Sequence, residues 1–102
     1  MARHRVASTD EIAIDSMKNV KIGDLEICIA HAEDGEFYAI NDICTHEEFN
    51  LSEGDVYGFD VECPQHGSRF DFRDGHVTGL PAVVTAQTFP VTVEGGDVYV
   101  DV

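Results

Sequence analysis

The chain has 102 residues, close to the usual size of one domain, and we expect a single domain over residues 1–102. It carries 20 Asp and Glu residues against 6 Lys and Arg, a formal net charge of −14. This balance excludes a nucleic-acid partner, because phosphate binding depends on clustered Lys and Arg, and it argues against binding to an anionic membrane. No apolar run approaches the roughly 18 residues of a membrane span, and no secretory signal is evident. We therefore expect a cytoplasmic protein.

Short strands separated by glycine turns predict an all-β fold. The expected strands, in chain order, are Arg3–Ala7, Met17–Ile22, Leu25–His31, Glu36–Ile40, Phe89–Val93 and Val98–Val102. Gly23, Gly35 and the Gly95–Gly96 pair fall where tight hairpin turns are needed. In the last pair of strands Phe89, Val91 and Val93 alternate with polar positions or Pro90, which predicts one buried face. The pattern indicates an antiparallel sandwich or barrel without long helices.

The middle of the chain, from Asn41 to about Leu80, is long, polar and without clear strand periodicity. Connections of this length inside a small domain are usually functional. The stretch from Ile22 to Ser68 also holds twelve carboxylates and no Lys or Arg. We expect the chemistry of the protein in this segment, with a negative field that can steer a basic partner toward it.

Three cysteines cannot all pair, so reduced thiols are expected. Cys28 lies between Ile27 and Ile29 on a predicted strand, where a cysteine behaves as a small buried hydrophobic residue. Cys44 and Cys63 lie in the polar middle segment and are available as metal ligands.

Two short motifs combine these cysteines with histidines: Cys44-Thr45-His46 and Cys63-Pro64-Gln65-His66. Each motif offers one thiolate and one imidazole, so together they form a two-plus-two ligand set. Zinc accepts such a set, and a structural Cys₂His₂ zinc module remains an alternative. Zinc sites of that type usually pair cysteine with cysteine and histidine with histidine, whereas a mixed pair on each loop suits two inequivalent irons.

With these two motifs the sequence resembles the Rieske [2Fe–2S] proteins, and in size it is similar to the ferredoxins of bacterial aromatic ring-hydroxylating dioxygenase systems. The resemblance implies one [2Fe–2S] cluster per chain, with Cys44 and Cys63 on one iron and His46 and His66 on the other. It also implies a cluster-binding subdomain, at about residues 41–80, inserted into the β fold. Gly79-Leu80-Pro81-Ala82 resembles the proline-bearing loop that covers the cluster in this family.

The resemblance further implies an electron-transfer component and not an enzyme. Such a monomer would carry single electrons from a flavin-containing ferredoxin reductase to a terminal oxygenase, binding each partner transiently. The alternative to such a freely diffusing carrier is a small Rieske-like subunit bound permanently to a larger reductase, such as a nitrite reductase.

Departures from the high-potential members of the family predict a low-potential cluster. Their disulfide across the cluster loops is absent, because the corresponding positions are Phe49 and Gln65. Ser68 matches a serine that donates a hydrogen bond to a cluster sulfur, but Phe70 replaces a tyrosine that does the same. Each missing donor leaves negative charge on sulfur less stabilised, which lowers the reduction potential. We expect Phe49 itself to pack in the core or within its loop, with membership of an apolar rim around exposed imidazoles as the alternative.

Overall fold

The computed structural model describes residues 2–45, 49–65 and 67–102, and these form three antiparallel sheets with one short 3-10 helix. The first sheet has the order β1 (Arg3–Ser8), β11 (Asp97–Asp101), β10 (Val91–Glu94). The second has the order β2 (Ser16–Ile22), β3 (Leu25–His31), β4 (Phe37–Asn41), β9 (Thr88–Phe89). The third has the order β5 (Asp55–Tyr57), β6 (Asp60–Glu62), β7 (Arg69–Asp71), β8 (Val77–Gly79), and the 3-10 helix η1 spans Leu51–Glu53.

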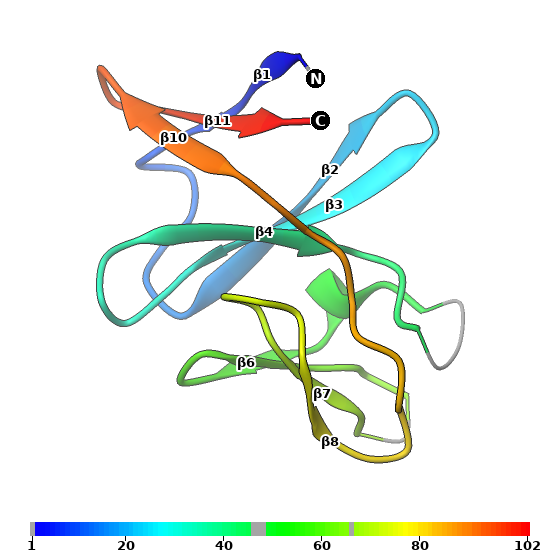
Figure 1. The fold of residues 1–102 in the computed structure, drawn as a ribbon. Coiled ribbons are helices and arrows are strands. Elements are labelled where there is room, and N and C mark those ends of the chain that lie inside the picture. Colours follow the sequence, from blue (N-terminus) through cyan, green and yellow to red (C-terminus); the bar gives the residue numbers. More distant parts are fainter. Residues whose placement is uncertain (1, 46–48, 66) are drawn as a thin grey trace.

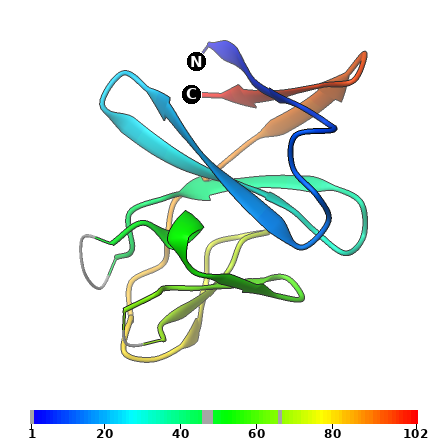
Figure 2. The ribbon, with the colours of Figure 1, turned by 180° about the vertical axis from the view of Figure 1, so that it is seen from behind.

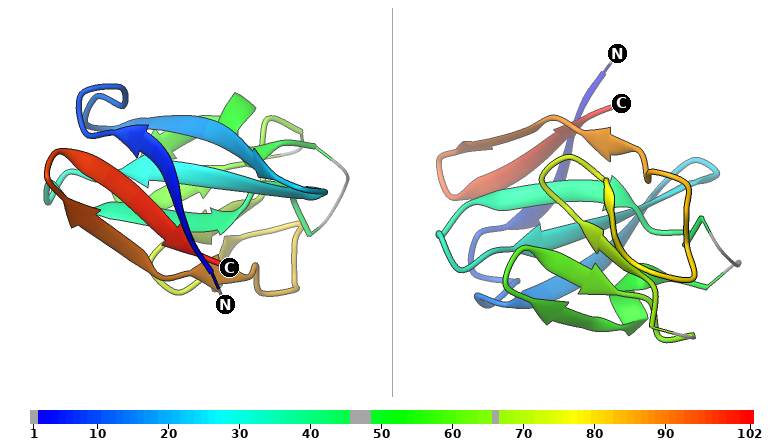
Figure 3. Two further views of the ribbon diagram at one scale, coloured as in Figure 1. Left: turned by 90° about the horizontal axis from the view of Figure 1, so that it is seen from above. Right: turned by 60° about the horizontal axis from the view of Figure 1, so that its bottom comes forward.

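The three sheets lie in layers, with the β2–β3–β4–β9 sheet in the middle (Figure 1). The N- and C-termini meet on the far side of the β1–β11–β10 sheet, away from the β5–β8 sheet. After β8 the chain returns along one edge of the molecule to β9 and β10, as Figure 2 shows from behind. The view from above in Figure 3 shows β1, β10 and β11 lying across the middle sheet. Among the described residues, no helix is long and apolar enough to cross a membrane.

Strand β3 is buried on both faces and so contributes to two hydrophobic cores. Ile27 and Ile29 pack with Val98 and Val100 of β11 in the core between the first two sheets. Cys28 and Ala30, which alternate with these two residues along the strand, face the other core. This core lies between the middle sheet and the β5–β8 sheet. Successive side chains of a strand point to opposite faces, so a run of four apolar residues fills both cores at once.

The second core connects the middle sheet to the segment that carries the predicted site. Its fully buried members include Leu51 of η1, Val61 of β6 and Phe70 of β7. Cys44 and Cys63 belong to the same core. The cysteines of both motifs are therefore packed against the middle sheet.

Most predicted strands are confirmed to within one or two residues, and Leu25–His31 is confirmed at both ends. Gly23 and Gly35, with φ of 61° and 83°, adopt the left-handed conformation expected at the two hairpin turns. Cys28 is buried as expected. The all-β prediction is confirmed, with the difference that the middle sheet is covered on both faces.

The predicted strand Phe89–Val93 is wrong as a single element, since it divides at Pro90 into β9 and β10. β9 pairs with β4 and β10 pairs with β11, so the division lets this segment pass from one sheet to the next. Proline has no N–H to donate to a ladder and is suited to such a position. Val93, expected on the buried face, is 45% exposed.

The four strands β5–β8 were not expected from the sequence. Each has only three residues, too few for an alternating pattern to emerge, yet they form a continuous antiparallel sheet. This sheet positions the segment between the two motifs.

Ile29→Ala tests the importance of the double-faced middle sheet. Removal of this fully buried side chain leaves a cavity in the first core. It should lower the free energy of unfolding by about 2–5 kcal/mol, measured by urea denaturation. Ile14→Ala, at a side chain that is 53% exposed, is the control. Equal effects of the two substitutions would contradict this assignment of the core.

Candidate metal centre

The two motif cysteines begin loops that are closed in the same way. The Cys44 N–H donates to the Phe49 carbonyl at 2.9 Å, and the Cys63 N–H donates to the Ser68 carbonyl at 2.7 Å. In each loop the bond joins a cysteine to the residue five positions further on. This bond fixes the position of the cysteine backbone at the base of the loop. Isolated bridge pairing of Ile43 with Asn50 extends the closure of the first loop.

Cys44 and Cys63 are 3% and 1% exposed and lie in the same core, although they are nineteen residues apart in sequence. Within the described residues, none of the three cysteines takes part in a disulfide. Two buried sulfurs on separate loops, gathered in one core, fit the cysteine half of the donor set that a diiron cluster needs. The metal-ligand assignment itself stays a prediction here.

Cys28 contrasts with this pair. Burial raises the pKa of its thiol well above the usual value, and the nearby Asp42 carboxylate adds to the shift. A thiol with a raised pKa stays protonated, whereas metal binding requires a thiolate. Cys28 is therefore a structural thiol of strand β3, as the sequence predicts.

A third loop, following β8, is hydrogen-bonded to both cysteine loops. The Thr45 hydroxyl, on the first loop, donates to the Val84 carbonyl at 2.7 Å. At the end of the second loop, the fully buried Ser68 Oγ accepts the Ala82 N–H at 3.0 Å. The Gly79–Ala82 segment thus lies against the end of the second cysteine loop, and that it covers a cluster stays a prediction.

Apolar side chains are exposed on these loops, and we call them the apolar rim. Leu80 is 75% exposed, Val83 77% and Val84 58% on the third loop. Phe49, on the first loop, is 39% exposed, so it does not lie in the core, and its exposure fits the apolar-rim alternative. Exposed large apolar side chains near a site are typical of a surface that another protein covers.

The turn between β7 and β8 is held by ion pairs. The Arg73 guanidinium donates to Asp71 at 2.7 Å, and these hydrogen bonds hold the pKa of the Asp71 carboxyl below its usual range. Asp74 and His76 are hydrogen-bonded at 2.5 Å, which raises the pKa of the imidazole. The ligand atoms of Asp71, Asp74 and His76 lie within 4.8 Å of one another, but these pairings already occupy them. We therefore assign these three side chains a structural role in stabilising the turn.

The histidines of the two motifs, His46 and His66, lie outside the described residues. Of the predicted site, the structure therefore describes only Cys44 and Cys63, which it buries in one core.

Comparison with known proteins identifies the family. The model of the Rieske [2Fe–2S] domain matches residues 2–90. The chain belongs to the Rieske [2Fe–2S] family. Its cofactor is accordingly a [2Fe–2S] cluster, and the zinc alternative is wrong.

Two curated relatives are similar over almost the whole chain. The ferredoxin component of the p-cumate 2,3-dioxygenase system of Pseudomonas putida is 41% identical over 98 residues, covering 95% of this chain and 83% of that protein. The ferredoxin component of the biphenyl 2,3-dioxygenase of Rhodococcus jostii is 38% identical over 101 residues, covering 99% and 94%.

Solved structures support the same family. The carbazole 1,9a-dioxygenase ferredoxin of Nocardioides aromaticivorans superposes with a TM-score of 0.92 at 30% identity, covering 98% of this chain and 97% of that one. A chain in the complex of reduced oxygenase and oxidized ferredoxin of a carbazole 1,9a-dioxygenase gives a TM-score of 0.91 at 32% identity, covering 96% and 100%.

Proposed function

We propose that this Rieske protein is the ferredoxin component of an aromatic ring-hydroxylating dioxygenase system. It is a one-electron carrier and not an enzyme, as its relatives of 38–41% identity are ferredoxin components. In this proposal it accepts electrons from a flavin-containing ferredoxin reductase and delivers them to a terminal oxygenase inside the cell. The observation that carries it is the pair of buried thiols on equivalent loops, in a chain that matches the Rieske domain over residues 2–90.

The proposed ligands are Cys44 and Cys63 for one iron and His46 and His66 for the other. The cluster supplies a site for one electron, and its neutral histidine ligands make reduction easier than in clusters with four thiolates. The chain holds the two sulfurs at the bases of closed loops and excludes water from them by burial. Residues 41–80 make up the cluster-binding subdomain in this proposal, and its core is shared with the middle sheet.

The apolar rim and the acidic surface support transient binding to other proteins. Within the part of the chain that the structure describes, five cationic side chains are paired with carboxylates: Arg3, Arg5, Lys18, Arg69 and Arg73. With 20 carboxylates in the chain, most of the surface charge that a partner meets is negative. Partners with basic docking surfaces are therefore favoured, because complementary charge increases the rate of encounter.

Substitution of the four proposed ligands tests the site. Cys44→Ser, Cys63→Ser, His46→Ala and His66→Ala should each abolish the [2Fe–2S] cluster or change its spectrum, because each removes one of the donors to iron. Iron and acid-labile sulfide content and the EPR spectrum of the reduced protein measure this. Cys28→Ala is the matched control and should retain the cluster, since Cys28 is a protonated buried thiol. Unchanged spectra in the His46 and His66 variants would contradict the ligand assignment.

We expect a reduction potential in the lower part of the range of roughly −150 to +300 mV that Rieske centres span. Phe70 is fully buried in the core beside the cysteines and offers no hydroxyl to a cluster sulfur, and Phe49 replaces a disulfide cysteine. A redox titration followed by EPR measures the potential. A value near the top of the range would contradict the argument.

The partner proposal predicts that electron transfer depends on salt. The rate of transfer from the reduced protein to a ring-hydroxylating terminal oxygenase should fall as ionic strength rises from about 0.01 M to about 0.15 M, where the Debye length shrinks from about 30 Å to about 8 Å. Stopped-flow oxidation of the reduced cluster measures this rate. A stable complex of fixed stoichiometry with a reductase, unaffected by salt, would favour the reductase-subunit alternative instead.

A further inference from the structure

Asp42 is a fully buried carboxylate immediately before the first motif. Only one residue separates it from Cys44, so the Cα atoms of the two are at most about 7 Å apart. Buried carboxylates are rare unless they are satisfied by partners, and this one is surrounded by hydrogen-bond donors. Its role is not accounted for by the ligand set.

The donors to Asp42 come from two separate parts of the chain, residues 50–52 and strand β2. Its Oδ1 accepts the Ser52 N–H at 2.7 Å, at the start of η1. Its Oδ2 accepts the Ser52 hydroxyl at 2.7 Å, the Asn50 amide at 2.8 Å and the Asn19 amide of β2 at 2.5 Å. Every partner donates, which is the arrangement that suits an ionised carboxylate.

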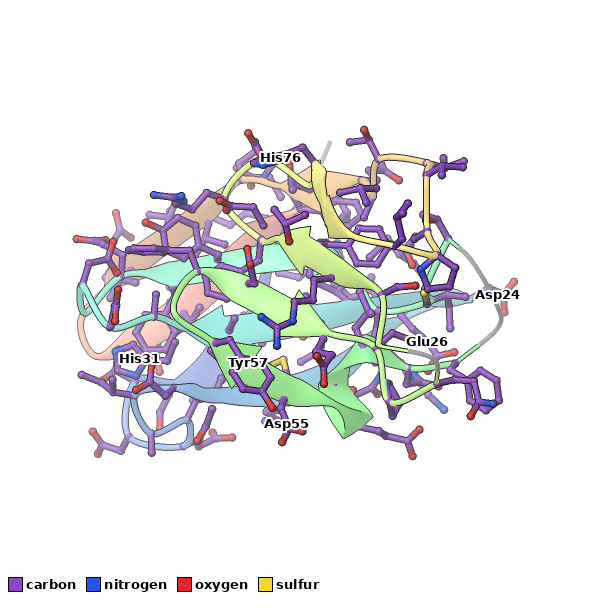
Figure 4. All side chains as sticks on the ribbon, turned by 90° about the horizontal axis from the view of Figure 1, so that it is seen from below. Asp24, Glu26, His31, Asp55, Tyr57 and His76 are labelled. Carbon is purple, nitrogen blue, oxygen red and sulfur yellow. The ribbon has the colours of Figure 1, made fainter. Side chains whose placement is uncertain are left out.

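A second carboxylate completes a closed ring of hydrogen bonds. Glu26 of β3 accepts, at its Oε1, the Asn50 amide at 2.9 Å and the Asn19 amide at 3.2 Å. Each of the two amides therefore bridges the two carboxylates. Figure 4 shows Glu26 near the end of the molecule where the β2–β3 turn, marked by Asp24, lies.

This ring clamps the base of the first cysteine loop to the middle sheet. Asp42 and Asn50 flank that loop on either side, and both are bonded to β2 and β3 through the ring. Main-chain bonds act in the same place, because the Asp42 N–H donates to the Glu26 carbonyl at 2.9 Å and the Leu51 N–H to the Asp42 carbonyl at 2.6 Å. The loop is fixed at both ends to one rigid support.

The ring also carries charge next to the proposed cluster ligand Cys44. Within residues 2–45, 49–65 and 67–102, no Lys or Arg pairs with Asp42 or Glu26; their partners are neutral amides, a hydroxyl and an N–H. Asp42 is fully buried and Glu26 half-buried, and charges in such settings are screened less than charges in water. Negative charge near a cluster opposes the arrival of an electron and lowers its potential.

We propose that Asp42 is a positioning residue of the cluster site, which together with Glu26, Asn19 and Asn50 clamps the first ligand loop and lowers the reduction potential through two fixed negative charges. The proposal rests on the ligand assignment given under the proposed function. It assigns two separable effects to one network: retention of the cluster depends on the hydrogen bonds, and the potential depends on the charges.

Two substitutions separate these effects. Asn50→Ala removes a donor to each carboxylate and leaves both charges in place. Glu26→Gln removes one charge, while the new carbonyl oxygen still accepts from Asn19 and Asn50. Asp42→Asn removes a charge and places an amide against donors, so it disturbs both functions. Asp55→Asn is the control: it makes the same charge change at an exposed carboxylate of the outer sheet, on β5 (Figure 4).

The measurements are the rate at which an excess of iron chelator removes the cluster absorbance and the midpoint potential by EPR-monitored titration. Asn50→Ala should lose its cluster about tenfold faster than the unsubstituted protein, the usual effect of removing a partner that supports a ligand, without a rise in potential. Glu26→Gln should show the reverse: its reduction potential should rise, while its cluster should be lost at an unchanged rate. Asp42→Asn should show both changes and Asp55→Asn neither.

The proposal is overturned if Asn50→Ala and Asp42→Asn lose the cluster no faster than Asp55→Asn. It is equally overturned if Glu26→Gln and Asp42→Asn have potentials no higher than Asp55→Asn. If Asp42→Asn does not accumulate as folded protein, Asn50→Ala and Glu26→Gln alone carry the test. Failure of the proposed function has a different signature, because the unsubstituted reduced protein would then pass no electrons to a terminal oxygenase, or the ligand variants would keep an unchanged cluster.

Discussion

The burial of strand β3 on both faces is the constraint on which the rest of the molecule depends. Ile27 and Ile29 complete one core, while Cys28 and Ala30 complete the other, so the middle sheet cannot shift toward either neighbour without opening a cavity. Because Cys44 and Cys63 are members of the second core, the positions of their sulfurs are set by the same packing that stabilises the fold. The stability of the fold and the placement of the two cysteines proposed as ligands are thus determined together.

On this support, hydrogen bonds determine the local shape of the site. The bond from each cysteine N–H to a carbonyl five residues later gives the two loops a common base, and Thr45 and Ser68 attach the third loop to both. The first loop has the additional ring of Asp42, Glu26, Asn19 and Asn50. A carrier that passes electrons gains from such rigidity, since a site that is already ordered need not reorganise when its charge changes.

The elements that the sequence predicts well are those in which a local pattern repeats. The glycine at the turn between two strand-forming segments locates β2 and β3, and the two mixed Cys/His motifs carry the resemblance to the Rieske family that implies the cluster. The strands β5–β8 are too short to show a sequence pattern. Their sheet packs on the middle sheet through the second core. Asp42 has the sequence context of an ordinary turn residue, because its burial depends on Asn19 and Glu26, which are distant along the chain. Pro90, by contrast, is visible in the sequence and marks the point at which the predicted strand Phe89–Val93 divides.

The meeting of the two chain ends has a consequence for how the domain can be used. Main-chain bonds join Ala2 and Val102 in both directions, on the pole away from the β5–β8 sheet (Figure 1). A peptide tether or a fused protein attached at either end would therefore leave the molecule without passing over the cysteine loops. The architecture suits both a diffusing shuttle and a module built into a longer polypeptide, and it makes either end a practical point for immobilising the protein on an electrode.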